Sequence, residues 1–398
     1  MSAMKRLFQL MADKKASDIF LSVGSPINIK INGVAMPVNQ TMLNADAVKT
    51  LLYEVLNEKQ IREYEEEMEL NTAFALEGVG AFRISAFRQK GSPAVVVRFI
   101  PGEVPKFDTL GLPDILKEII MQKRGLILMV GATGSGKSTS LSAMLDLRNE
   151  QKSGHILTLE DPVEFMFKNK KSIVNQREVG TDTKSFETAL KNALRQAPDC
   201  ILIGEIRDKQ TMGMALAYAQ SGHLALATLH ANNSYHAMNR IISFYPLENR
   251  PTLLLDLSAA LQAIVSQRLV RTKTGARRAA VEVLLNTRHI AELIEKGDIN
   301  EIKDAMEKSM SPGSQTFEQS LFNMFMEGSI TQEECMTNAD SATNMMWLIN
   351  QATAGTISSG GGGAPAPGDK KEEKKDAALS TTAGPGASFS DFKIDASV

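Results

Sequence analysis

One eight-residue stretch, residues 131–138, constrains this chain more than any other. It reads GATGSGKS and matches the phosphate-binding loop G-x-x-x-x-G-K-[ST]. The apolar run LILMV, residues 126–130, precedes it, and a helical pattern over residues 139–145 follows. Strand, glycine loop and helix are the context that this loop requires, so we expect the chain to bind a nucleoside triphosphate. The alternative, a chance glycine loop between a core strand and a helix, leaves the full motif unexplained.

The loop also predicts which atoms meet the triphosphate. Its glycines let successive backbone N–H groups turn inward around the α- and β-phosphates, and the helix N-terminus adds the positive end of a dipole. Lys137 is expected to reach the β- and γ-phosphates, and the Ser138 hydroxyl is expected to ligate Mg²⁺. The candidate nucleotide-binding residues are Gly131, Ala132, Thr133, Gly134, Ser135, Gly136, Lys137, Ser138 and Thr139.

Length and composition narrow the class of protein. The 398 residues allow two or three domains, and 43% hydrophobic with 23% charged residues is ordinary for a soluble globular protein. A formal net charge of −2 gives no indication of nucleic-acid binding. The two cysteines, Cys200 and Cys335, stand far apart, which fits a reducing compartment and excludes a cysteine-ligated structural zinc site. No apolar run approaches the roughly 18 residues of a membrane span, and no signal-peptide core is present.

The order of patterns along the chain predicts two domains. Residues 1–100 mix an amphipathic helix with alternating strands, one of which turns at Asn32-Gly33, and this mixture predicts a small α+β domain. Prolines and glycines punctuate residues 101–112, which we predict to be a hinge linker. Residues 113–354 repeat strand then helix, which predicts a largely parallel sheet covered on both faces. Helical patterns dominate after residue 250, apart from a strand expected at residues 279–285.

The final segment, residues 355–398, differs from the rest in composition. It contains the run SSGGGG, alternating Ala and Pro, and the charged run KKEEKK. Such a segment buries too little apolar surface to offset the entropy of ordering, so we predict a disordered tail. Phe389, Phe392 and Ile394 leave open a short docking motif near its end.

Carboxylates follow two of the strands predicted in the second domain, and a nucleotide hydrolase needs such groups beside its phosphate loop. Glu205 ends the apolar stretch CILIG, an arrangement that resembles a Walker B strand with Glu in place of Asp, and it is expected to hold Mg²⁺ through water. Glu160, Asp161 and Glu164 follow another strand, where they repel one another unless a cation or hydrogen-bond donors lie nearby. One of these three is the candidate base or water-positioning residue, and a surface acidic turn is the alternative.

A histidine and several arginines complete the candidates. His230 follows a strand at the expected carboxyl edge of the sheet, where a contact with the γ-phosphate or a water competes with an ordinary structural role. Guanidinium groups suit phosphates, but composition alone does not separate the arginines considered from solvated surface residues. These arginines are Arg83, Arg88, Arg98, Arg195 and Arg207.

Taken together, the motifs resemble those of the PilT/PilU family of secretion-type hexameric ATPases, which drive the retraction of type IV pili. The resemblance covers about residues 3–350, and its motifs stand in the family's order. They are the opening signature of a PAS-like domain at residues 16–24, Walker A at 131–138, the Asp box at 157–165, Walker B (LIGEIRD) at 202–208 and the His box (GHLALATLH) at 222–230.

The resemblance implies a fold and roles for residues. The fold is α/β, with a PAS-like α+β N-terminal domain followed by a RecA-like P-loop ATPase core. Glu164 takes the place of the catalytic glutamate, Glu205 that of the Walker B carboxylate, and His230 faces the nucleotide. Arg83 and Arg98 lie where the family's first domain presents arginines to the nucleotide of a neighbouring subunit.

The resemblance also implies an activity and partners. The activity is hydrolysis of ATP to ADP and phosphate, with Mg²⁺ held by Ser138 and Glu205, in a ring of six copies that drives pilus retraction and twitching motility. The expected location is the cytoplasm at the inner-membrane base of the pilus machine. The expected partners are a PilT-like retraction ATPase and the inner-membrane platform protein, with no nucleic acid and no membrane span.

Two departures select a branch of the family. The assembly ATPases of the superfamily carry a four-cysteine zinc site, which two cysteines cannot build, so the retraction branch is favoured. The stretch AIRNLIRE of PilT is replaced by NTRHIAELIE at residues 286–295, and together with the long tail this favours the PilU branch. An accessory or scaffold ring subunit with little motor activity of its own stays open as the alternative. A P-loop kinase or nucleic-acid translocase is disfavoured by the balanced charge.

Overall fold

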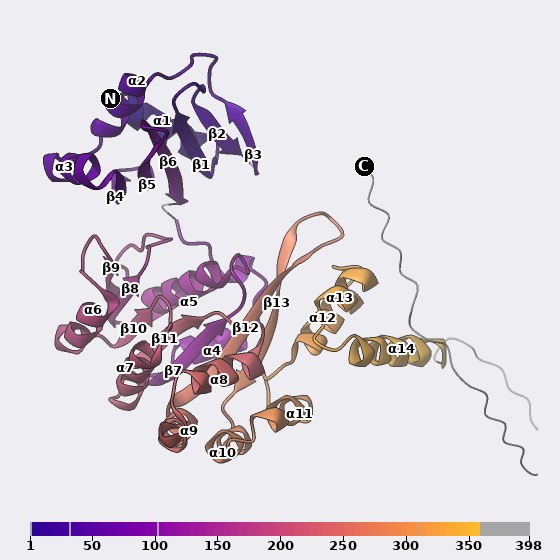
Figure 1. Cartoon of the computed structure of the whole chain (residues 1–398). Coiled ribbons are helices and arrows are strands. Elements are labelled where there is room, and N and C mark those ends of the chain that lie inside the picture. Colours follow the sequence, from indigo (N-terminus) through magenta and orange to yellow (C-terminus); the bar gives the residue numbers. More distant parts are fainter. Residues whose placement is uncertain (1, 32, 102, 310, 359–398) are drawn as a thin grey trace, which may run out of the picture. The chain divides into compact units, whose positions relative to one another are not determined.

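The computed structural model describes residues 2–31, 33–101, 103–309 and 311–358. Two sheets and a helical C-terminal part make up this region (Figure 1). The tail predicted at residues 355–398 lies mostly outside it, since residues 359–398 are not described. Residues 355–358 belong to the last helix, so the helical part runs past residue 354. Within the described residues, no helix is both long and apolar enough to cross a membrane.

The first sheet has six strands in the order β3-β2-β1-β6-β5-β4, and every neighbouring pair is antiparallel. The hairpin predicted at residues 32–33 is confirmed, because Ile31 of β2 pairs with Val34 of β3. The helical repeat of apolar residues at the start forms α1, whose Phe8 stacks on Phe82 of β5 at 4.1 Å between ring centroids. The elements are α1 Ala3–Asp13, β1 Asp18–Ser22, β2 Asn28–Ile31, β3 Val34–Pro37, α2 Ala45–Tyr53, α3 Glu58–Glu67, β4 Glu69–Leu76, β5 Gly80–Gln89 and β6 Ser92–Pro101.

The second sheet has seven strands in the order β13-β12-β7-β11-β10-β8-β9. All neighbouring pairs are parallel except β12 with β13, so the largely parallel sheet is confirmed. Its strands are β7 Gly125–Val130, β8 Gly154–Glu160, β9 Ser172–Glu178, β10 Cys200–Ile203, β11 Leu224–Leu229, β12 Leu261–Arg271 and β13 Arg277–Leu285. Helix α4 Ile115–Ile120 precedes the first of these strands, and the α-helices between the strands are α5 Lys137–Gln151, α6 Phe186–Ala193, α7 Lys209–Gln220, α8 Ser234–Ser243 and α9 Arg250–Ala260.

Strand β7 shows why this sheet is buried on both faces. All six of its residues are buried. Leu126 and Leu128 belong to a hydrophobic cluster with residues of α6, α7 and α9, whereas Ile127 and Met129 belong to a second cluster with residues of α4 and α5. Alternate residues of a strand point to opposite faces, so a continuous apolar run fits a strand with helices on both sides.

The expectation that helices dominate after residue 250 was wrong for β12. This eleven-residue strand lies between β7 and β13 and pairs with both. It follows α9 directly, so the apolar pattern of the helix runs into the strand without a break, and the pairing with two neighbours decides its conformation. The edge strand β9 was also missed, because Ile173 and Val174 are its only apolar residues and do not form an apolar run.

The helices after residue 315 pack on the β12–β13 pair. Val270 of β12 and Ala280 of β13 share a buried cluster with Phe317, Leu321 and residues of the helices that follow. The helices of this cluster are α12 Phe317–Met326, α13 Gln332–Asn338 and α14 Ala342–Ser358, whereas α10 Arg288–Lys296 and α11 Ile302–Glu307 belong to the cluster that contains Leu126 and residues of α9.

Candidate active site

The parallel sheet brings the ends of four strands to one edge. Val130 at the end of β7 pairs with Leu229 at the end of β11, and Ile203 at the end of β10 pairs with Ala227 of β11 and Leu159 of β8. Because parallel strands share a direction, the segments that follow these strands emerge together. This edge therefore gathers the phosphate-loop motif and the acidic and histidine segments, although they are far apart in the sequence.

The loop after β7 has a backbone that only glycine accommodates at two positions. Gly131 has φ +154°, and a Cβ there would lie 2.6 Å from the Gln267 carbonyl oxygen. Gly136 has φ +86°, and a Cβ there would lie 2.8 Å from Gln267 Nε2. Gly136 is also the N-cap residue of α5, and it has no side chain with which to cap the first N–H groups of the helix. These N–H groups can therefore donate to an anion.

Lys137 is buried in this loop, with its ammonium group facing the loop backbone. The Nζ atom donates to the carbonyl oxygens of Gly131 at 2.8 Å and Ala132 at 2.9 Å. Burial lowers the pKa of Lys137, while the charges of Glu205 and Glu164 act in the opposite direction. An ammonium group has three N–H donors, so one remains for a phosphate oxygen.

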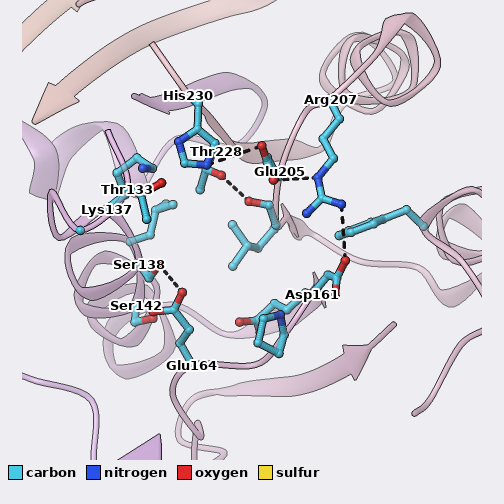
Figure 2. A pocket seen from close by; sticks show the side chains of 17 residues that line it. Thr133, Lys137, Ser138, Ser142, Asp161, Glu164, Glu205, Arg207, Thr228 and His230 are labelled. Carbon is cyan, nitrogen blue, oxygen red and sulfur yellow. Dashed lines mark hydrogen bonds and ion pairs between the residues drawn. The ribbon is translucent and has the colours of Figure 1, made fainter. Parts of the chain in front are cut away.

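Beside the loop lies a cavity of about 220 Å³, and its walls carry most of the candidate residues (Figure 2). The charged and titratable residues among those that line it are Lys137, Glu160, Asp161, Glu164, Glu205, Arg207 and His230. Thr133, Gly134 and Ser138 of the loop line it as well. One cavity thus unites the phosphate loop with every carboxylate that the sequence singled out.

The three carboxylates after β8 have different surroundings. Glu164 Oε1 accepts a hydrogen bond from Ser138 Oγ at 2.9 Å, so it lies beside the hydroxyl proposed for Mg²⁺ (Figure 2). Glu160 is buried and accepts from Thr158 Oγ1 at 2.6 Å and from Gln176 Nε2 at 3.2 Å. Burial raises the pKa of Glu160. Glu164 is therefore the exposed, loop-facing carboxylate, and Glu160 is a hydrogen-bonded group in the wall.

Glu205 faces two basic side chains across the same cavity. Its Oε2 accepts from Arg207 Nε at 2.7 Å, and its Oε1 lies 3.6 Å from His230 Nε2 (Figure 2). Arg207 also reaches Asp161, with 3.5 Å between Nη1 and Oδ2. Sequence reasoning did not separate Arg207 from the other arginines, although its place two residues after the Walker B carboxylate is a signal that could have done so.

Arg83 and Arg98 are not among the residues that line this cavity. They belong to the first sheet, where Arg83 of β5 lies directly opposite Arg98 of β6. Arg98 Nε donates to Asp18 Oδ1 at 2.9 Å. Burial lowers the pKa of Arg83 and so does the charge of Arg98, whereas the charges of Glu178, Asp161 and Glu164 act in the opposite direction. The structure thus places these two arginines directly opposite each other on the first sheet.

The remaining arginines lie elsewhere. Arg88 pairs with Glu65 and stacks over the Tyr64 ring, and Arg195 is an exposed residue after α6. Thr139 is not among the residues that line the acidic cavity; it lines a second cavity, of about 500 Å³. This second cavity is also lined by Leu110, Gly136, Leu269, Arg277 and Arg278.

Comparison with known proteins gives consistent matches over most of the chain. The family described as "Type II/IV secretion system protein" matches residues 2–337. "Type IV pilus ATPase PilU" of Pseudomonas aeruginosa is 47% identical over 346 residues, which are 87% of this chain and 91% of that protein. "Type IV pilus retractation ATPase PilT" of the same organism is 38% identical over 338 residues, 85% of this chain and 98% of that protein. The crystal structure of the pilus retraction motor PilT with bound ADP matches with a TM-score of 0.81 at 39% identity, covering 87% of this chain and 99% of that one.

Proposed function

Because this chain belongs to the Type II/IV secretion system protein family, we propose that it is a motor ATPase that couples ATP hydrolysis to type IV pilus retraction and twitching motility. The observation that carries the proposal is the single cavity that unites Lys137, Ser138, Glu164 and Glu205. The solved relative with ADP supports an adenine nucleotide as its ligand. In this proposal the second domain is a RecA-like core, and the first is PAS-like.

ATP binds with its phosphates against the N–H groups of the loop and the start of α5. Lys137 donates to the β- and γ-phosphates with the N–H that its two carbonyl partners leave. The base fits the second cavity, where Leu110 and Leu269 supply apolar surface beside Thr139.

The donors at the cavity suit Mg²⁺, because the Ser138 hydroxyl and the Glu205 carboxylate are hard oxygen ligands. Ser138 would hold the ion directly, and Glu205 would hold it through water. When bound, Mg²⁺ neutralises charge on the β- and γ-phosphates. A Ser138 hydroxyl that ligated the ion would turn its lone pairs toward it, which would leave Glu164 free to accept a proton from another donor.

Hydrolysis needs a water held in line with the bond between the γ-phosphorus and the β–γ bridging oxygen. Glu164 orients this water and takes its proton, while the new P–O bond forms and the bridging bond breaks to give ADP and phosphate. His230, on the opposite wall, contacts the γ-phosphate or the water. Glu160 stays in the wall and holds the segment after β8 through Thr158 and Gln176.

In a ring of six copies, each cavity can receive arginines from a neighbouring copy. Arg83 lies directly opposite Arg98, and Asp18 pairs with Arg98, so Arg83 is the guanidinium of the two that an added anion would suit better. We assign them to the phosphates of a neighbouring copy, with residues 101–112 as the hinge between the two domains. The ring works in the cytoplasm at the inner-membrane base of the pilus, against the platform protein and with a PilT-like partner, as the higher identity to PilU supports.

A single experiment tests this function in the full chain. ATP hydrolysis by the purified protein is measured with and without a PilT-like partner, and pilus retraction is measured in cells that carry the wild type or Glu164→Gln. We expect intrinsic hydrolysis and a retraction defect in the variant. A ring that hydrolyses no ATP alone but supports retraction with the partner would identify an accessory subunit instead.

A further inference from the structure

Arg207 is held in the wall of the active-site cavity by the start of α7. Its backbone N–H donates to Thr211 Oγ1 at 3.3 Å. Thr211 is in turn fixed by Asp208, the N-cap residue of α7, whose Oδ1 accepts from Thr211 N at 2.8 Å. This reciprocal cap fixes the backbone at Arg207, so only the side chain of Arg207 has to rotate when its guanidinium changes partner.

The guanidinium has two carboxylate partners at unequal distances. Arg207 Nε lies 2.7 Å from Glu205 Oε2, and Nη1 lies 3.5 Å from Asp161 Oδ2 (Figure 2). The Arg207 side chain is 54% exposed and Asp161 is 42% exposed, whereas Glu205 is 22% exposed. The arginine is therefore free to move, and a small rotation exchanges its short contact with Glu205 for one with Asp161.

A magnesium ion at Glu205 would compete with this contact. Arg207 already occupies Oε2, and His230 Nε2 faces Oε1 at 3.6 Å, so a water of Mg²⁺ that donates to the carboxylate meets a basic group at either oxygen. Two cations drawn to one carboxylate repel each other, and solvent that reaches Arg207 keeps this repulsion moderate. The contact of Arg207 with Glu205 and the binding of Mg²⁺ at Glu205 therefore weaken each other.

We propose that Arg207 is a positioning residue that holds Glu205 and passes to Asp161 when magnesium nucleotide binds. The proposal rests on the nucleotide site of the proposed function and adds a regulation to it. This exchange of partners sets the Mg²⁺ concentration that nucleotide binding requires. It also makes the bridge that Arg207 forms between Glu205, after β10, and Asp161, after β8, depend on whether the metal is bound. No covalent step is involved: the ion pair of Arg207 with Glu205 breaks, and the ion pair of Arg207 with Asp161 shortens.

The test measures the Mg²⁺ requirement of nucleotide binding, which is independent of turnover. A fluorescent ATP analogue is bound to the full chain while Mg²⁺ is titrated. In Arg207→Gln the competitor is gone, so we expect the half-saturating Mg²⁺ concentration to fall about two- to five-fold, as for a solvent-accessible ion pair. Arg207→Lys keeps the charge but loses the Nε donor, and we expect a fall of intermediate size. Arg195→Gln, an exposed arginine outside the cavity, is the control.

Asp161→Asn separates the exchange from a general effect of charge. Without its second partner Arg207 stays on Glu205, so we expect a higher Mg²⁺ requirement. In the Arg207→Gln background the same substitution has at most a small effect, and the difference is the coupling between the two residues. Additive effects of the two substitutions would overturn the proposal, as would an unchanged Mg²⁺ requirement in Arg207→Gln.

The outcomes also separate this proposal from the proposed function. If the wild type binds no nucleotide at any Mg²⁺ concentration, the nucleotide site itself fails. If Arg207→Gln weakens binding equally with Mg²⁺ and with a chelator, Arg207 contacts phosphate directly and the exchange is wrong. Thermal unfolding of each variant checks folding, and Asp161→Asn, with the opposite expected sign, decides the matter if Arg207→Gln does not fold.

Discussion

The two sheets of this protein present charged residues in different ways. In the parallel sheet, strand ends from four segments meet at one edge, and their carboxylates, lysine and histidine surround one cavity. In the antiparallel sheet, the charged residues lie within the strands, as cross-strand partners, instead of after the strand ends. Lys30, Asp18, Arg98 and Arg83 are consecutive partners across β2, β1, β6 and β5.

That difference indicates that the two sheets carry different parts of the nucleotide site. The cavity beside the parallel sheet is lined by Lys137 and Ser138, which can donate to phosphate, and by carboxylates of a kind that suits a hard cation. The row in the first domain ends in two arginines, of which Arg98 has Asp18 as a partner and Arg83 faces Ala73 on its other side. We infer that the first domain supplies charge to phosphates that the second domain of another copy has bound. Four substitutions test this division.

The largest effect is expected from Lys137→Ala, which removes the cation of the parallel-sheet site. We expect no detectable binding of an ATP analogue and, with it, no turnover, because a buried charge-assisted donor to the phosphates is lost. Equilibrium binding and phosphate release are the measurements. Retained binding of nucleotide by this variant would contradict the assignment of the phosphate site to the second domain.

Glu164→Gln is expected to separate binding from chemistry. The amide keeps a hydrogen-bonding partner for Ser138 but accepts no proton from water, so turnover should fall on the order of 10²–10⁴-fold while nucleotide still binds. Single-turnover hydrolysis with bound ATP measures the chemical step. Turnover at the wild-type rate would show that another carboxylate of the cavity activates water.

Arg83→Gln probes the other side of the comparison. We expect nucleotide binding to persist and turnover to fall on the order of 10²-fold, since a donor to the developing charge is lost. The matched control is Arg88→Gln on the same strand, whose guanidinium pairs with Glu65. Mixed rings of Arg83→Gln and Lys137→Ala chains should recover part of the activity, because each variant supplies what the other lacks. No recovery would place the arginine in its own subunit's site.

The smallest effect is expected from Glu160→Gln, which acts on stability. Burial raises the pKa of Glu160 above its ordinary 4.5, so the favourable contribution of the protonated carboxyl is lost as pH rises from 4.5 through the raised pKa. The variant should therefore unfold at a higher temperature than the wild type at neutral pH, and the difference should vanish below pH 4.5. A drop in turnover as deep as that of Glu164→Gln would give Glu160 a catalytic role instead.

Local patterns were enough to find much of this fold and site. The phosphate loop could be read from eight residues, because glycine spacing, a lysine and a hydroxyl are local requirements of phosphate binding. The strands β7, β8, β10 and β11 could be predicted because a strand that is buried on both faces is a continuous apolar run, which is visible in the sequence without knowledge of its neighbours. Strand β12 could not, since its conformation follows from pairing with β7 and β13.

The sequence by itself determined the chemistry available to this protein: a phosphate loop, carboxylates after two strands and a histidine after a third. Only the tertiary structure decided which groups meet. It set Glu164 against Ser138, buried Glu160 in the wall, and brought Arg207 from an undistinguished set of arginines to Glu205 and Asp161. The physical reason is that hydrogen bonds and ion pairs act over a few ångströms, and those distances arise from the register of strands far apart in the chain.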